Sequence, residues 1–208
     1  MLRVEHLQVR GLPRMSFEVP SGECFAVLGP SGSGKTLLLR AIADLDPDLA
    51  EDGAPGHVLL GGLDRREMPA HQWRRLVRFV PTEPAWWTET ARAHLTADSD
   101  PARLLRSLAL DETLLDRPLA QLSTGERQRL ALVRAMIDEP KVLLLDEPTA
   151  ALDATNAALV EELIRFQLLQ GRSVILVSHD PEQARRLAHA ELHLGAMPER
   201  VPDGEGSQ

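Results

Sequence analysis

Three short runs of apolar residues, each bounded by polar or turn-forming positions, stand out along the chain. They cover residues 24–28, 141–145 and 173–177. Strands of a parallel sheet are buried on both faces, so they form near-continuous apolar runs of this length rather than alternating ones. Each run is followed by glycine or by residues able to do chemistry, and ligands of open α/β sheets bind at the carboxyl ends of the strands. The pattern therefore predicts a parallel sheet with one site where three strands end.

The stretch between residues 83 and 139 has a different character. Its apolar positions recur at helical spacing over 103–108 and 129–137, which predicts a helical subdomain inserted into the α/β core. Proline and glycine are frequent over 46–62, and this segment predicts turns leading into a short strand at 57–60.

The expected organisation is a single domain. A chain of 208 residues can bury a sizeable core and suits one domain with a subdomain insertion. The last twelve residues lack apolar density, which predicts a disordered tail. The expected boundaries are 1–208 for the domain, about 1–82 and 140–196 for the core, about 83–139 for the helical subdomain and 197–208 for the tail.

Composition and charge exclude several classes of protein. Thirty-one acidic and 23 basic side chains give a formal net charge of −8, and no nucleic-acid partner is expected because phosphate binding needs a basic surface. The single cysteine, Cys24, excludes an intrachain disulfide and the usual cysteine-based zinc site. No apolar run approaches the roughly 20 residues of a membrane-spanning helix. The first residues read as a strand rather than a signal peptide, so we expect a cytoplasmic protein.

A glycine-rich loop follows the first buried run and precedes a helical pattern. It fits G-x-x-x-x-G-K-[ST], whose glycines let backbone N–H groups curl into an anion-binding nest at a helix N-terminus. The lysine supplies an ammonium for the β- and γ-phosphates, and the threonine hydroxyl is placed to ligate Mg²⁺. An ordinary glycine-rich turn is the alternative, but the order strand, loop, helix favours nucleoside triphosphate binding. The predicted binding residues are Gly29, Pro30, Ser31, Gly32, Ser33, Gly34, Lys35 and Thr36.

Two adjacent carboxylates follow the second buried run. Asp146 is the expected Mg²⁺ partner, and Glu147 can orient or deprotonate the attacking water. Two carboxylates beside a triphosphate repel it without a metal, so Mg²⁺ is implied. The alternative is that Asp-Glu-Pro only caps a helix.

A third motif narrows the class. Residues 122–132 read Leu-Ser-Thr-Gly-Glu-Arg-Gln-Arg-Leu-Ala-Leu, and they are followed by Pro-Thr-Ala-Ala-Leu-Asp over 148–153 and Ser-His-Asp over 178–180. This ordered set resembles the signature, D-loop and switch histidine of ATP-binding-cassette (ABC) ATPases, over roughly residues 4–194. Ser123 and the Gly125 backbone can cap a helix beginning near Glu126 and aim N–H groups at phosphate. An N-capped amphipathic helix without this role is the alternative.

The resemblance implies a fold and a mechanism. The fold is α/β, with a P-loop NTPase parallel-sheet core, a small antiparallel β region and the inserted helical subdomain. Two copies are expected to form a head-to-tail homodimer, with each ATP between one phosphate loop and the partner's signature. The residues expected to act in trans are Ser123, Thr124, Gly125 and Glu126 of the signature and Asp153 of the D-loop. His179 is expected to contact the γ-phosphate and to hold Glu147 and its water, and Glu147, His179 and Lys35 form the expected catalytic set.

Two positions depart from the family's pattern. Thr82 occupies the place of the family's Q-loop glutamine, which usually touches Mg²⁺ or water and relays the nucleotide state. Glu83 or a water can fill the gap, and we expect altered coupling rather than lost binding. The aromatic residue that usually stacks on adenine is absent. Arg10 could stack its guanidinium on the base, and Leu12 could supply an apolar contact.

Two adjacent tryptophans follow the Q-loop segment. One interpretation is that Trp86 and Trp87 pack the helical subdomain, and the other is that they form a partner-facing patch, because tryptophan is enriched at interface hot spots. In ABC transporters this region forms the groove for the permease's coupling helix. Arg92 and His94 could add polar contacts there.

Three functions are compatible with these motifs. The leading hypothesis is the ATP-binding and ATP-hydrolysing subunit of an ABC transporter, located peripherally on the cytosolic face of the inner (plasma) membrane. ATP and Mg²⁺ are its expected cofactors, and a separate transmembrane permease is its expected partner. The alternative is a soluble ABC ATPase in DNA repair or translation. A P-loop small-molecule kinase is the third reading, but it leaves the segment 122–132 and His179 unexplained.

Overall fold

The predicted parallel sheet forms the centre of the molecule. The computed structural model describes residues 1–46, 56–96 and 99–195. Within them, five parallel strands run in the order β6-β7-β8-β3-β9. Their bounds are β3 Cys24–Leu28, β6 Val77–Val80, β7 Val142–Asp146, β8 Ser173–Val177 and β9 Ala190–His193. The three predicted runs became three neighbouring strands, β7, β8 and β3, so their carboxyl ends meet at one edge.

Of the three strands that were predicted, two have the predicted bounds and the third is shifted by one residue. β3 and β8 match the runs 24–28 and 173–177, and every residue in both is buried. β7 begins at Val142 and includes Asp146, because Asp146 still pairs with Val177 of β8. The last residue of β7 is therefore a buried carboxylate at the edge where the site was expected.

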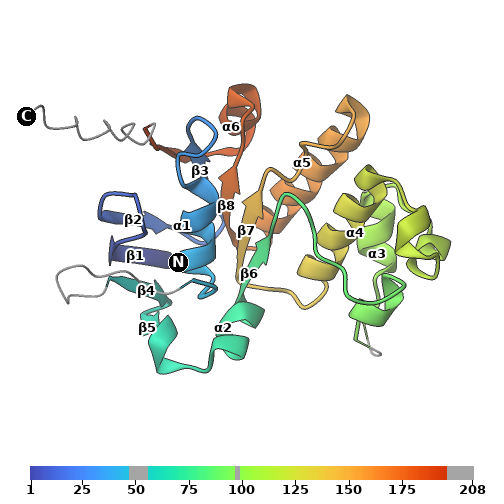
Figure 1. Ribbon diagram of the computed structural model, residues 1–208, viewed down its shortest axis with the longest axis horizontal. Helices are drawn as coiled ribbons and strands as arrows, with labels where there is room; N and C mark the ends of the chain where they lie inside the picture. The colour runs from blue at the N-terminus through green and yellow to red at the C-terminus, as the bar shows by residue number, and fades with distance from the viewer. Residues whose placement is uncertain (47–55, 97–98, 196–208) are drawn as a thin grey trace, which may run out of the picture.

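A smaller antiparallel sheet lies beside the main one. Its strands run in the order β2-β1-β4-β5, and β4 has the predicted bounds. The sheet and the helix α1 share an apolar core with one face of the parallel sheet. Figure 1 shows them next to each other on the side of the molecule where the N-terminus lies. The bounds are β1 Leu2–Leu7, β2 Met15–Val19, β4 His57–Leu60, β5 Leu63–Asp64, α1 Lys35–Ile42 and α2 Ala70–Leu76.

The opposite face of the parallel sheet is covered by α5 and by the inserted helical subdomain (Figure 1). Apolar side chains of α3, α4 and α5 pack there against β7 and β8 in a second core. α3 lies one residue earlier than the helix predicted over 103–108, and α4 begins five residues earlier than the periodicity over 129–137 indicates. The bounds are α3 Ala102–Ser107, α4 Thr124–Met136, α5 Ala154–Leu169 and α6 Pro181–Leu187.

The remaining ordered segments are short 3₁₀ turns at Arg65–Glu67, Arg92–His94, Glu112–Leu115 and Leu119–Gln121. The fold class predicted from the sequence is confirmed: a parallel core, a small antiparallel sheet and a helical insertion between β6 and β7. The tail predicted over 197–208 lies outside the described residues, as do the turns predicted over 47–55.

Candidate nucleotide-binding and catalytic site

The glycine-rich loop connects β3 to α1, and its backbone requires glycine. Gly29 has a φ of 149°, and a Cβ added there would lie 2.4 Å from the carbonyl oxygen of Leu194. Gly34 has a φ of 93°, and its Cβ would lie 2.8 Å from the side chain of Leu12. Both positions combine a backbone conformation that L side chains avoid with close neighbours. Gly34 also precedes α1, and no side chain caps that helix, so its N-terminal partial positive charge faces the loop.

Lys35 lies across this loop. Its side chain is buried, and the Nζ atom donates hydrogen bonds to the carbonyl oxygens of Gly29 and Pro30, both at 2.8 Å. These two bonds hold the ammonium against the backbone at the start of the loop.

The next residue joins the loop to β7. The hydroxyl of Thr36 donates to Oδ2 of Asp146 over 2.7 Å. Asp146 is 3% exposed, and its Oδ1 atom is buried without a hydrogen-bond partner in the described part of the chain. Buried acceptors are rarely left unpaired. A hydroxyl and a carboxylate oxygen side by side are the donor set that Mg²⁺ prefers, so these residues fit the ion.

Glu147 sits in a left-handed backbone conformation with a φ of 50°. Its N–H donates to the carbonyl of Val177 and its own carbonyl accepts from the amide of Gln128, both over 3.0 Å. Its carboxylate Oε1 lies 2.7 Å from Nε2 of His179. Non-glycine residues with positive φ are uncommon, and when the surroundings fix them in place they cluster at functional sites.

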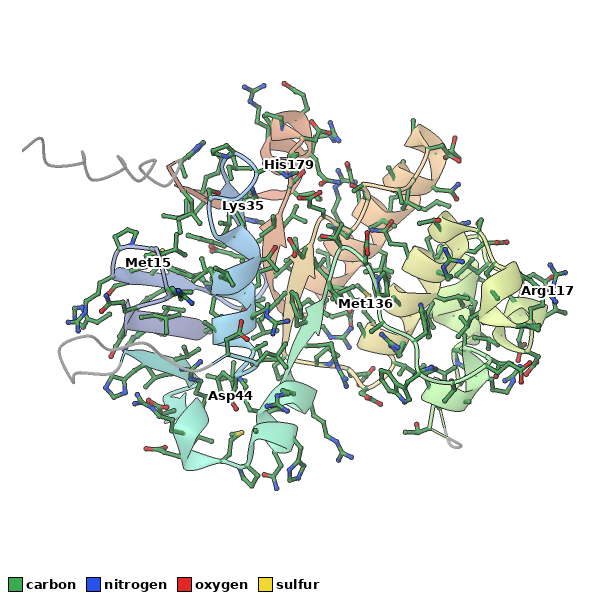
Figure 2. The ribbon with its side chains drawn as sticks, viewed as in Figure 1. Met15, Lys35, Asp44, Arg117, Met136 and His179 are labelled. Carbon is green, nitrogen blue, oxygen red and sulfur yellow. The ribbon has the colours of Figure 1, made fainter. Side chains whose placement is uncertain are left out.

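One pocket of about 270 Å³ brings together Lys35, Thr36, Glu147 and His179, and Asp146 is not among the residues that line it. Figure 2 places Lys35 and His179 at the same end of the parallel sheet. The pocket therefore joins the anion-binding loop to the Glu147–His179 pair. It is lined by Ser31, Gly32, Gly34, Lys35, Thr36, Leu37, Glu147 and His179.

The signature segment starts α4 with a capping box. The Ser123 hydroxyl accepts from the N–H of Glu126 over 3.2 Å, and the Glu126 carboxylate accepts from the N–H and hydroxyl of Ser123, both over 2.8 Å. The backbone and hydroxyl bonds from Ser123 lower the pKa of Glu126. The helix starts at Thr124 rather than near Glu126, because the reciprocal cap satisfies its first N–H groups.

The signature does not line this chain's own pocket. Ser123 and Thr124 are exposed, and neither Gly125 nor Glu126 is among the pocket residues. Asp153 also lies outside it: it caps α5 by accepting the N–H of Asn156 over 2.8 Å, and this bond lowers its pKa. The two segments predicted to act in trans therefore lie apart from the site predicted to act in cis.

The roles predicted for Thr82 and Arg10 concern residues away from the pocket lining. Thr82 is half-buried just after β6, and Arg10 is exposed in the turn that follows β1. Neither residue lines the pocket. Leu12, the apolar contact predicted beside Arg10, instead packs over Gly34. Both roles stay predictions.

Gln128 is a site residue that the sequence did not single out. It is 2% exposed and holds the Glu147 carbonyl from α4. A glutamine on an otherwise apolar helix face is the only signal in the sequence, and it names no partner.

The two tryptophans play different parts. Trp86 is half-buried and packs against the core of the helical subdomain, whereas Trp87 is 75% exposed. Both rings meet His94 edge-on, with centroids 4.9 and 4.3 Å away, and the Arg134 guanidinium lies 4.3 and 5.2 Å from the two ring centroids. Burial and the neighbouring Arg134 lower the pKa of His94. Trp87, His94 and Arg134 line a groove of about 300 Å³, which we call the aromatic groove.

Comparison with known proteins identifies the family of the chain. The sequence profile of the ABC transporter family matches residues 12–150, more than half of the chain. The chain therefore belongs to the ABC transporter family. Among the described residues, no helix has the length and apolar character needed to cross a membrane.

Individual relatives extend the similarity over nearly the whole chain. Protein STAR1 of Oryza sativa subsp. japonica is 35% identical over 97% of this chain and 64% of its own length. The lipoprotein-releasing system ATP-binding protein LolD of Shewanella sp. (strain MR-4) is 37% identical over 85% of this chain and 81% of its own. The dimeric post-hydrolysis structure of the ATP-binding cassette MJ0796 with ADP and Pi matches 93% of this chain and 94% of that one, with a TM-score of 0.79 and 23% identity. The chain spans 56–66% of the length of the first four curated relatives it matches.

Proposed function

We propose that this chain is the ATP-binding and ATP-hydrolysing subunit of an ABC transporter, and that two copies close on ATP to drive a separate membrane permease. One observation carries the proposal. The phosphate loop shares a pocket with Glu147 and His179, while the Ser123 cap lies on an exposed surface outside that pocket. A second copy related by two-fold symmetry brings the cap of each chain to the loop of the other and completes two equivalent sites.

The chain's own residues define the chemistry of each site. Lys35 exchanges its bonds to the loop carbonyls for bonds to the β- and γ-phosphates. Glu147 accepts a proton from the water that attacks the γ-phosphate. His179, 2.7 Å from that carboxylate, fixes its orientation and lies beside the γ-phosphate. The Glu147 backbone, held with a φ of 50°, keeps the carboxylate aligned before ATP binds.

Thr36 and Asp146 are the residues that would hold Mg²⁺. Their oxygen atoms are adjacent, and the buried Oδ1 of Asp146 offers an acceptor position with no other use in the described residues. The ion neutralises charge on the phosphates when it is bound. Thr82 is proposed as a more remote contributor to this site and Arg10 as the platform for adenine.

The closed dimer adds contacts from the second copy. Ser123, Thr124, Gly125 and Glu126 present a capped helix N-terminus whose partial positive charge suits the γ-phosphate of the partner's ATP. Asp153 of each chain reaches the opposite phosphate loop. The ATP-binding cassette MJ0796, which shares this fold, forms a dimer in a post-hydrolysis state with ADP and Pi bound.

The aromatic groove is the proposed docking site for the permease. Trp87 is a large exposed side chain at its rim, and Arg134 has hydrogen bonds and ring contacts but no carboxylate partner among the described residues. A half-buried guanidinium of this kind favours an acidic side chain on the incoming element. Docking there places the chain on the cytosolic face of the membrane.

Two experiments test the proposal. Glu147→Gln should bind Mg-ATP with near wild-type affinity and hydrolyse it at least 100-fold more slowly, because the amide cannot accept the proton. Near-normal turnover of this variant would remove Glu147 from its role. The affinity-tagged chain should also co-purify with an integral membrane protein from detergent-solubilised membranes. Recovery with ribosomes or DNA instead would favour the soluble ABC ATPase.

A further inference from the structure

A buried carboxylate on α5 lies beside the catalytic pair without belonging to it. The Glu161 side chain is 8% exposed, and its carboxylate accepts two hydrogen bonds from the guanidinium of Arg186 on α6, over 2.6 and 3.0 Å. These bonds and the nearby positive charges lower the pKa of Glu161, so it stays ionised. Arg186 also lies 3.7 Å from Asp180, the residue after His179. The Glu161–Arg186 ion pair therefore holds α6, and with it the segment that carries His179, against α5.

A buried glutamine extends this pair toward Glu147. Gln183 of α6 is 2% exposed, and its Nε2 donates to Glu161 Oε1 over 3.4 Å and to the Thr149 hydroxyl over 3.0 Å. An ionised carboxylate only accepts hydrogen bonds, so Glu161 fixes which end of the amide faces it and therefore aims the second N–H at Thr149.

Thr149 belongs to the turn that begins at Glu147. The N–H of Ala150 donates to the Glu147 carbonyl over 3.2 Å, and the N–H of Leu152 donates to the Thr149 carbonyl over 3.0 Å. The Thr149 side chain is thus attached to the rigid turn that starts from the catalytic carboxylate. Glu147, Thr149, His179 and Gln183 line one groove of about 730 Å³, with Glu161 and Arg186 along the same wall.

We propose that Glu161, Gln183 and Thr149 are positioning residues that set the distance between Glu147 and His179. The chain of bonds from Arg186 through Glu161 and Gln183 to Thr149 ties the segment before α6 to the turn after β7. These are the two segments that carry His179 and Glu147. No member of the relay lines the nucleotide pocket, so it acts on alignment and leaves ATP binding alone. This inference depends on the roles proposed above for Glu147 and His179.

Thr149→Val is the most direct test, because it exchanges the hydroxyl for a methyl group and keeps the shape of the side chain. The variant removes the acceptor for Gln183 and leaves a buried N–H without a partner. We expect kcat for ATP hydrolysis to fall about tenfold, since small misalignments of reacting groups are costly, while KM for ATP stays within about twofold. Thr149→Ser retains the hydroxyl and should restore most of kcat.

Two further variants separate positioning from loss of structure. Gln183→Leu removes the donor at the other end of the bond, and the double variant with Thr149→Val should be no slower than the slower single variant. Arg185→Ala is the matched control on α6, because Arg185 points to solvent and pairs with the exposed Glu182. Its kcat should equal that of the wild type.

The decisive comparison uses His179→Ala as background. If the relay acts through the Glu147–His179 contact, adding Thr149→Val to His179→Ala should lower the residual kcat by less than twofold. An undiminished tenfold loss there, a matching rise in KM, or a wild-type kcat for Thr149→Val would each overturn the inference. A Glu147→Gln variant that still hydrolyses ATP would instead show that the proposed catalytic roles are wrong.

Discussion

Ser123 caps α4 in its own chain and is also proposed to contact the partner's ATP. The substitution Ser123→Ala separates these two roles. Ser123→Ala deletes the hydroxyl that accepts the Glu126 N–H and one of the two bonds that Ser123 gives the Glu126 carboxylate. Loss of a helix N-cap costs about 1 kcal/mol. In a domain of this size that lowers Tm by roughly 2–4 °C, a small part of a typical stability of about 5–15 kcal/mol. The folded monomer therefore survives.

The assay measures binding and association separately. In the Glu147→Gln background, a fluorescent ATP analogue reports the affinity of the monomer, and light scattering reports the dimer formed with Mg-ATP. Because Ser123 does not line its own pocket, we expect unchanged monomer affinity and at least a tenfold weaker dimer.

Asp111→Ala provides the matched control for this prediction. Asp111 caps the turn Glu112–Leu115 in the same subdomain by accepting the Thr113 N–H over 2.8 Å. The substitution Asp111→Ala should lower Tm by an amount similar to that of Ser123→Ala and leave dimerisation intact. Ser123 has no role in the partner's site if Ser123→Ala dimerises like this control, or if the substitution weakens the affinity of the monomer for ATP.

Three further outcomes follow from the structure. Lys35→Ala should raise the Kd for ATP about 10- to 100-fold in equilibrium binding, since charge-assisted bonds to phosphate are lost; an unchanged Kd contradicts this. Burial raises the pKa of Asp64, but hydrogen bonds from Arg66 and His57 outweigh it and lower the pKa to about 2. In urea unfolding at pH 7, the free energy of unfolding of Asp64→Asn should therefore be about 2 kcal/mol lower than that of the wild type. This difference between variant and wild type should shrink as the pH falls from about 4 toward 2, and a difference that does not change with pH would refute the lowered pKa of Asp64. Trp87→Ala should reduce the amount of integral membrane protein that co-purifies from solubilised membranes, at unchanged Tm. Leu169→Ala, which removes a side chain 83% exposed on α5, should leave that amount unchanged. Equal amounts with both variants would count against docking at the aromatic groove.

The parts of the fold that were predictable are those encoded locally. Apart from Ser173, the runs at 24–28 and 173–177 are apolar and bounded by turns, so the sequence indicated both the strands and their limits. β7 was misplaced by one residue because a carboxylate, Asp146, takes part in its pairing. The apolar periodicity indicated α4 only from residue 129 because the residues before it are mostly polar, whereas the predicted Ser123 cap put the start near Glu126, two residues after the observed start at Thr124.

The candidate site divides in the same way. The phosphate loop is one continuous motif, so its residues could be named in advance. The relay cannot be read from spacing, because Thr149, Glu161 and Gln183 come from a turn, α5 and α6, and they meet only when the sheet forms. Gln128 is likewise polar on a buried face, and its partner is the backbone of Glu147, 19 residues away. Side-chain networks between distant segments depend on tertiary packing, which periodicity does not specify.

The proposed function requires Mg-ATP to bind between two copies of this chain. The most direct measurement is the mass of purified Glu147→Gln by size-exclusion chromatography with light scattering, with and without Mg-ATP. We expect a change from the 22.9 kDa monomer to a species of twice that mass, reversed when Lys35→Ala is added. A mass that stays monomeric at saturating Mg-ATP, with nucleotide bound and the membrane partner present, would contradict it.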